Sequence, residues 1–354
     1  MRRYTDGMGV KATLKEVARE AGVAVTTAAV VLRGDFSITL APATRERVLA
    51  AARRLGYRRN LQAASLRSGR SNWVGILVAS LEKPVVLLKI QALEQRLHAA
   101  GFRGLLRTTG GEAELEAHFL QEFADSPVAA LVLADWPTLT LAPQLRPLLD
   151  RGVPVLALEP VPELGARVDC ITVDRPTGGY RITRHLLELG HRRIGLLHGG
   201  RADAGLQQRF DGYDRALAEA GLKPDPHLEA EITAHTFAAG YEAARRLLRR
   251  KRRPTALFCL NDEVAIGAMR AIREAGLAIP GDLAVAGFDD IPAAPFAPVP
   301  LTTVRQPVAE IADRAAARLG ERIRAAAAGE PPVPAHLECA LVPELIVRAS
   351  TVPA

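Results

Sequence analysis

Short apolar runs alternate with longer amphipathic stretches along most of the chain, from Trp73 onward. The apolar runs have the length of a strand and include "VGILVA", "AALVLA", "VPVLAL", "RIGLLH", "TALFCL" and "LAVAGF". The stretches between them, such as "LKIQALEQRLHAAG" and "FAAGYEAARRLLRR", repeat their apolar residues at the spacing of a helix. Alternation of this kind is typical of parallel strands covered by helices. We therefore expect an α/β core of two doubly wound parallel-sheet subdomains.

The chain before this core predicts three short helices. Thr13 and Glu16 have the spacing of a capping box, so the first helix is expected to begin after Thr13. Gly22 follows where a helix-turn-helix needs its tight turn, and a second helix is predicted over about residues 25–32. The third is predicted in "TRERVLAAARRLGYR". Helices this short need one another to bury an apolar face, so they should form one small domain.

These two parts of the chain differ in net charge. Residues 1–71 carry fourteen Lys and Arg against five Asp and Glu, a net charge of +9, whereas the remaining residues sum to −2. A basic module on a nearly neutral body indicates a polyanion as the partner of that module. The alternative is a basic surface that only contacts solvent.

Length and motifs exclude several other classes of protein. The 354 residues suggest two or three domains, and the three cysteines show neither CxxC spacing nor a metal-type cluster. The apolar stretches are too short to span a membrane, and no signal-peptide core follows the first arginines, which favours a cytoplasmic protein. No phosphate-binding glycine motif or HExxH pattern occurs, so neither an enzyme nor a bound cofactor or metal is expected.

Polar residues follow three of the predicted strands. Glu159 comes after "VPVLAL", the pair Asn261 and Asp262 after "TALFCL", and the pair Asp289 and Asp290 after "LAVAGF". Ligands of open parallel sheets bind beyond the carboxyl ends of the strands, so these side chains are candidates for a binding site. The same residues could instead cap the following helix or turn the chain.

Several long segments resemble the lactose-repressor (LacI/GalR) family of bacterial transcription regulators. They include "ATLKEVAREAGVAV", "SLRSGRSNWVGILV", "GGYRITRHLLELGHRRIGLLHGG", "PTALFCLNDEVAIGAMRAIREAGL", "LAVAGFDDIP" and "PLTTVRQP", in the family's order, and the resemblance extends from about Ala12 to Ser350. It implies a helix-turn-helix headpiece over 12–59, a hinge helix and linker over 60–71, and a periplasmic-binding-protein-like ligand-binding and dimerisation core over 72–350. The first core subdomain is expected over about 72–173 and 307–335, and the second over about 174–306 and 336–350.

The resemblance also implies a set of ligand-binding residues. These are Glu159, Asp174, Arg209, His235, Asn261, Asp289 and Gln306. An arginine, carboxylates and amides around a crevice suit a neutral or anionic polyhydroxylated ligand, such as a sugar or a related metabolite. Val85 and Val86 stand where the family has aromatic residues, and His235 replaces another aromatic residue. Fewer ring faces weaken stacking, which disfavours a purine.

The DNA-binding positions implied by the resemblance lie in the headpiece and hinge. They are Thr13, Val25, Thr26, Thr27, Val30, Asn60, Ala63 and Leu66. The headpiece departs from the family, because Ala24 and Ala41 replace capping serines and no arginine stands at Val30. Two interpretations follow: the helix reads an unusual operator through methyl contacts and DNA shape, or the headpiece has lost specific binding.

The retained basic excess and the intact hinge positions favour specific binding. By resemblance, Leu66 wedges into the minor groove at a central CpG step, although a leucine here could instead pack the linker against the core. Valine and threonine methyl groups recognise the thymine methyl, so a palindromic operator with thymines in each arm is expected. We expect a homodimeric repressor whose small-molecule effector shifts the angle between the core subdomains. A solute-binding protein, the alternative, would need a signal peptide and no basic headpiece.

Overall fold

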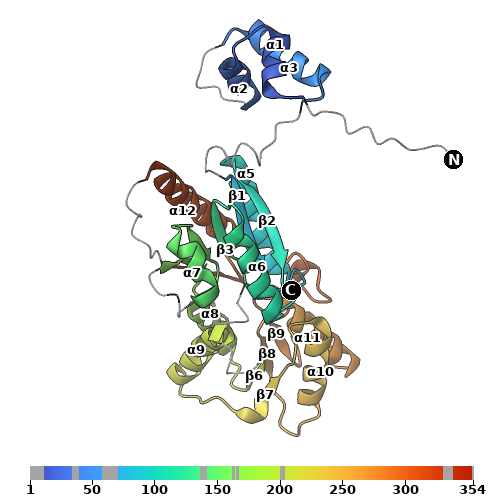
Figure 1. The fold of residues 1–354 in the computed structure, drawn as a ribbon. Helices are drawn as coiled ribbons and strands as arrows, with labels where there is room; N and C mark the ends of the chain where they lie inside the picture. Colours follow the sequence, from blue (N-terminus) through green and yellow to red (C-terminus); the bar gives the residue numbers. More distant parts are fainter. Residues whose placement is uncertain are drawn as a thin grey trace, which may run out of the picture. The chain divides into compact units, whose positions relative to one another are not determined.

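The computed structural model describes residues 12–33, 40–57, 71–135, 142–161, 164, 167–199, 204–329 and 338–352. The chain divides into two compact units, 1–70 and 71–354, and each is described by itself (Figure 1). We call the first unit the headpiece and the second the core. Within the described residues, no helix is both long enough and apolar enough to cross a membrane.

The headpiece contains three helices around a small apolar centre. They are α1 (Leu14–Ala21), α2 (Val25–Arg33) and α3 (Pro42–Arg54). The predicted capping box is present, since the Thr13 hydroxyl accepts from the Glu16 amide at 3.3 Å and the Glu16 carboxylate accepts from the Thr13 amide at 2.7 Å. Gly22 ends α1 with a φ of 63°, the left-handed conformation that the tight turn requires. Val17, Ala28 and Val48, one from each helix, are buried together.

The first lobe of the core is built on a six-stranded parallel sheet. Its strand order is β11-β5-β4-β3-β1-β2. The strands are β1 (Trp73–Val78), β2 (Arg103–Thr108), β3 (Ala130–Leu133), β4 (Val155–Ala157), β5 (Asp169–Val173) and β11 (Glu338–Leu341). Its helices are α5 (Pro84–Ala99), α6 (Ala113–Asp125), α7 (Ala142–Asp150) and α12 (Val308–Ala328). Separate apolar clusters join α5 with α12 and α6 with α7, as expected for a sheet covered on both faces.

The second lobe has a four-stranded parallel sheet of order β7-β6-β8-β9. Its strands are β6 (Ile194–His198), β7 (Glu229–Glu231), β8 (Ala256–Cys259) and β9 (Ala284–Ala286). The helices α8 (Arg175–Glu188) and α9 (Ala204–Glu219) pack against each other, as do α10 (Phe237–Leu248) and α11 (Asp262–Glu274) (Figure 1). The α/β core of two doubly wound subdomains expected from the alternating pattern is therefore confirmed.

The chain crosses between the lobes at three places. It leaves β5 for α8, returns from β10 (Thr303–Arg305) to α12, and passes from β11 to β12 (Glu344–Ile346), which pairs antiparallel with β10. The expected placement of 336–350 in the second lobe is wrong for its first part. Cys339 pairs with Ile171 of β5, so β11 completes the first sheet and covers the edge of β5.

Close contact of α8 with α9 depends on glycine. A Cβ atom added to Gly179 would lie 2.1 Å from the backbone oxygen of Arg209, far inside van der Waals contact. We therefore expect Gly179→Ala to lower the free energy of unfolding by about 1–3 kcal/mol, measured by urea denaturation.

The matched control is Gly281→Ala. The nearest atom to a Cβ at Gly281 is 3.6 Å away, so this change should leave stability unchanged or slightly raised. Equal losses in both variants would contradict the packing argument.

Candidate functional site

Three polar side chains predicted to line a binding site lie just beyond the ends of strands. Glu159 follows β4, Asn261 follows β8, and Asp289 follows β9, and all three are buried. Parallel strands present their carboxyl ends at one edge of a sheet, so each lobe carries its polar residues at one edge. Their interactions with neighbouring side chains decide what each of them does.

In the first lobe, Glu159 lies between two buried cations. Its Oε1 atom accepts from the ammonium of Lys89, on α5, at 3.1 Å, and its Oε2 atom accepts from the guanidinium of Arg175. Arg175 also donates to the hydroxyl of Thr172 at 3.0 Å. Burial by itself would raise the pKa of Glu159, but the charges of Arg175 and Lys89 hold that pKa below its usual value. Glu159 is thus an ionised carboxylate with both oxygens engaged, and neither cation was among the predicted site residues.

In the second lobe, Asp289 is held by an amide and a guanidinium. The Gln306 side chain donates to Asp289 Oδ1 at 2.5 Å, and the Arg209 guanidinium lies 3.5 Å from the same oxygen. Arg209 also lies over the ring of Phe288, with 4.4 Å to the ring centroid. Burial raises the pKa of Asp289, although Arg209 and Gln306 oppose this effect. The structure therefore brings together three of the predicted ligand residues.

The residues at the start of α11 differ in their hydrogen-bond partners. Asn261 caps the helix, since its Oδ1 atom accepts from the Val264 amide at 3.0 Å. Asp262 accepts from the Ile291 amide at 2.8 Å and from the Thr303 hydroxyl at 2.5 Å, which binds it to the neighbouring loop. Glu263 differs: it is 4% exposed, and no described residue donates to its Oε2 atom. Sequence reasoning missed Glu263, which carries no motif of its own.

Other polar residues at the strand ends have structural partners. Asp174 caps α8 by accepting from the Thr177 amide at 3.0 Å and from its hydroxyl at 2.7 Å. His235 is half-buried, and its carbonyl faces the Asn261 amide at 3.5 Å. Asp290 pairs with Arg305 at 2.7 Å and with Arg348 at 2.8 Å. Asp174 therefore caps a helix and Asp290 is held in ion pairs, while the ligand roles of Asp174 and His235 stay predictions.

The polar groups of the two lobes are close enough to affect one another. Burial raises the pKa values of Asp289 and Glu263, and positive charges of the first lobe, on Lys89 for Asp289 and on Lys83 for Glu263, oppose part of this rise. We call the following residues the junction cluster: Lys89, Glu159, Arg175, Arg209, Glu263, Asp289 and Gln306. Among the residues that the structure describes, no group of His, Cys, Asp or Glu could hold a metal ion.

The headpiece exposes part of the predicted DNA-reading surface. Val25 is 41% exposed and Thr26 is also exposed, whereas Thr27 is half-buried. Val30 is only 8% exposed, although it is not part of the apolar cluster that contains Ala28, and its contact with DNA stays a prediction. The Thr13 hydroxyl is engaged in the capping box, donating to Glu16 at 3.0 Å. Asn60, Ala63 and Leu66 lie outside the described residues.

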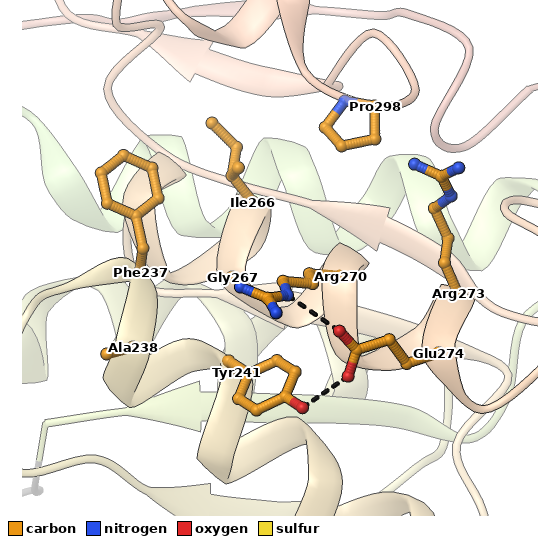
Figure 2. A pocket seen from close by; sticks show the side chains of 9 residues that line it. All are labelled: Phe237, Ala238, Tyr241, Ile266, Gly267, Arg270, Arg273, Glu274 and Pro298. Atoms are coloured by element: carbon orange, nitrogen blue, oxygen red, sulfur yellow. Dashed lines mark hydrogen bonds and ion pairs between the residues drawn. The ribbon is translucent and has the colours of Figure 1, made fainter.

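A separate groove lies on the second lobe between α10 and α11. We call it the second-lobe groove; it has a volume of about 830 Å³ and is lined by Phe237, Ala238, Tyr241, Ile266, Gly267, Arg270, Arg273, Glu274 and Pro298. Figure 2 shows Tyr241 and Arg270 both directed at Glu274, with hydrogen bonds of 2.5 and 2.9 Å. Phe237 is 48% exposed at one side of the groove. The groove thus has apolar residues beside three polar side chains that are joined by hydrogen bonds.

Family models match both units. Residues 13–60 match the model described as bacterial regulatory proteins, lacI family, and residues 183–351 match the periplasmic binding protein-like domain. A PurR transcriptional repressor from Haemophilus influenzae strain PittEE is 33% identical over 344 residues, which cover 96% of this chain and 98% of the relative. The ribose operon repressor of Haemophilus influenzae is 33% identical over 314 residues, covering 88% of this chain and 92% of that protein.

Solved structures of similar architecture include ligand-bound regulators. A complex of the transcriptional regulator CelR with cellobiose has a TM-score of 0.70 and 29% identity, and the match covers 96% of this chain and 100% of that one. A LacI family regulator from Enterococcus faecium with bound ribose has a TM-score of 0.68 and 27% identity, covering 80% of this chain and 99% of that one.

Removing the buried carboxylate of Glu263 should stabilise the protein at neutral and higher pH. Burial, followed by the charge of Asp289, raises the pKa of Glu263 from 4.5 to about 7. The folded state therefore loses stability as pH rises from 4.5 through 7, while below 4.5 the group is protonated in both states. The shift corresponds to about 3 kcal/mol, so Glu263→Gln should unfold at a higher urea concentration than wild type at about pH 8 and at the same one at about pH 4.

Glu82→Gln is the control, because Glu82 is exposed and its substitution should not change the pH dependence of unfolding. If both variants kept the wild-type pH profile, the buried carboxylate would not be a source of instability.

Proposed function

The chain belongs to the LacI family of bacterial transcriptional regulators, and on that premise we propose how its own residues serve a repressor controlled by an effector. The observation that carries the proposal is the junction cluster, in which each lobe buries polar side chains beyond its strand ends and Arg175, at the crossing between the lobes, pairs with Glu159 of the first lobe. A small molecule at this position contacts both lobes and can therefore favour one angle between them. We place the protein in the cytoplasm with its operator and assign it no catalytic step.

The headpiece is proposed to read DNA through α2. Val25 and Thr26 offer exposed methyl groups, which recognise the methyl group of thymine in the major groove. Thr27 is half-buried beside this surface, and Val30 is proposed to add a further methyl contact from the same helix. Asn60, Ala63 and Leu66 are proposed to complete the contact in the minor groove, Leu66 as the wedge.

The effector is proposed to be polyhydroxylated. Arg209, Asp289 and Gln306 already form a fixed set of donors and acceptors, and Asn261 lies at the start of the neighbouring helix. Side chains of these types pair with hydroxyl groups. The ribose operon repressor is among the relatives, and cellobiose is bound in one of the similar structures, which supports a sugar-like compound.

The second-lobe groove is proposed to be covered by a second copy of this chain. A palindromic operator requires two headpieces related by a two-fold axis, and such interfaces place the same patch of each subunit face to face. Phe237 and Pro298 supply the apolar part of that patch (Figure 2). Arg273, at the far side of the groove, supplies a polar rim.

Introducing a negative charge on the exposed face of α2 should weaken operator binding. Val25→Glu places a carboxylate in the first turn of α2, where it suits the helix dipole but faces the DNA phosphates. We expect the affinity for a fragment selected from random DNA to fall at least about tenfold in a gel-shift titration. Val342→Glu, at an exposed position in the core, is the matched control and should bind as wild type does. Equal binding by both variants would remove α2 from the DNA contact.

A charge in the second-lobe groove should separate the two copies. Phe237→Asp keeps the first turn of α10 stable, because an acidic residue suits a helix start, while it removes the exposed ring. We expect sedimentation equilibrium to give twice the chain mass for wild type and a dimer dissociation constant at least about tenfold weaker for the variant. Leu115→Asp, at an exposed position on α6, should remain dimeric. A dimeric Phe237→Asp variant would place the interface elsewhere.

A further inference from the structure

One stretch of the second lobe is strongly basic. Residues 245–253, which form the end of α10 and the loop after it, read "RRLLRRKRR" and carry seven positive charges without an acidic residue. The core has a net charge of −2, so its other residues sum to −9. Positive charge is therefore concentrated at one place on a core that is otherwise acidic.

Backbone contacts bring a second basic segment to the same place. The guanidinium of Arg193 donates to the carbonyl of Arg253 at 3.0 Å, and the Thr255 amide donates to the carbonyl of Arg193 at 2.8 Å. Residues 192–193 lead into β6 and residues 249–253 lead into β8, so both segments lie at the amino ends of these strands. We call the following exposed residues the basic end: Arg192, Arg193, Arg249, Lys251, Arg252 and Arg253.

The other three cations of the stretch have structural partners. Arg245 pairs with an acidic side chain one turn earlier in α10 at 3.3 Å. Arg246 and Arg250 donate to backbone carbonyls of β7, at 2.6 and 3.0 Å. These contacts hold the end of α10 against the sheet, and positive charge at this end also suits the helix dipole. Helix capping and packing therefore account for these three residues and not for the basic end.

The charges of the basic end are largely uncompensated. Within the described residues its one ion pair joins Arg252 to Asp225 at 3.8 Å, and Arg252 is 71% exposed, so this pair contributes little. The side chains of Arg249, Lys251 and Arg253 bond to no described residue, and the other two members donate only to backbone carbonyls. Like charges at this density repel one another, so the basic end is suited to an external polyanion.

The side chains of the basic end favour the phosphate groups of a DNA duplex. Five of the six residues are arginines, whose planar sets of donors match phosphate oxygen atoms. Leu247 and Leu248, the apolar residues of the stretch, are buried, which disfavours insertion into a membrane. The basic end contains no aromatic ring on which the bases of a single strand could stack. A duplex, with its phosphates on the outside, needs only exposed cations.

We propose that the basic end binds the phosphate backbone of a second DNA segment while the headpiece holds the operator. Duplex DNA is the polyanion of highest local concentration around a repressor bound to its operator. Such binding does not depend on base sequence and weakens as salt rises, because it releases counterions. The junction cluster remains free, since Asp289 follows the carboxyl end of β9 and the basic end lies at the opposite edge of the same parallel sheet.

DNA titrations of the full-length protein test this proposal. The headpieces are first saturated with a stoichiometric amount of a short unlabelled duplex selected from random DNA. A fluorescent duplex without that sequence is then titrated at low salt, and wild type should bind it, as measured by fluorescence anisotropy. The combined variant Arg249→Gln, Lys251→Gln and Arg252→Gln should bind the labelled duplex at least about tenfold more weakly, with a slope of log affinity against log salt that is less steep by about 2–3. Its affinity for the selected duplex at physiological salt should be unchanged.

The matched control removes the same number of charges elsewhere on the core. Arg103→Gln, Arg146→Gln and Arg314→Gln change exposed positions of the first lobe, so this combined variant should bind both duplexes as wild type does. Thermal unfolding shows whether both variants are folded.

Three results would overturn the inference. The first is equal binding of the labelled duplex by the two combined variants, and the second is a wild type that binds no labelled duplex once its headpieces are saturated. The third is binding of poly-L-glutamate but not of the labelled duplex at the basic end, which would assign this surface to an acidic protein instead.

Discussion

The pairing of Glu159 with Lys89 and Arg175 is the interaction on which the arrangement of the core depends. Glu159 follows β4, Lys89 lies on α5, and Arg175 is the first residue of α8, at the crossing into the second lobe. Because none of these charges contacts solvent appreciably, each can stay ionised only while the others remain in place. One carboxylate thereby ties a strand end and a covering helix of the first lobe to the start of the second.

The polar side chains of the second lobe use only part of their hydrogen-bonding capacity within the protein. Gln306 lies next to a crossing between the lobes, and its amide nitrogen is bonded to Asp289 while its oxygen has no donor among the described residues. A ligand that hydrogen-bonds to such atoms on both lobes binds more tightly in one arrangement of the lobes than in another. The chain crosses between the lobes next to the site. A small shift of the backbone at these crossings therefore changes the angle between the lobes. This is the physical basis for linking an effector to the headpiece.

Much of the fold could be predicted from the sequence because it depends on local patterns. The alternation of apolar runs and amphipathic stretches predicted both sheets, and the spacing of Thr13 and Glu16 predicted the first cap. The site residues were harder to predict, because Lys89 lies in an ordinary helical pattern and its partner Glu159 is 70 residues away in the sequence. The place of β11 depends likewise on contacts between distant segments, which periodicity does not contain.

The most direct test of the link between the junction cluster and the headpiece is operator affinity in Asp289→Ala, measured with and without a compound that binds wild type. Asp289 lies in the core, and the account predicts that ligand-free Asp289→Ala binds a selected operator as tightly as wild type. Adding the compound should change the operator affinity of wild type and leave that of the variant unchanged, because the variant loses the partner of Arg209 and Gln306. An undiminished response in Asp289→Ala would contradict the account.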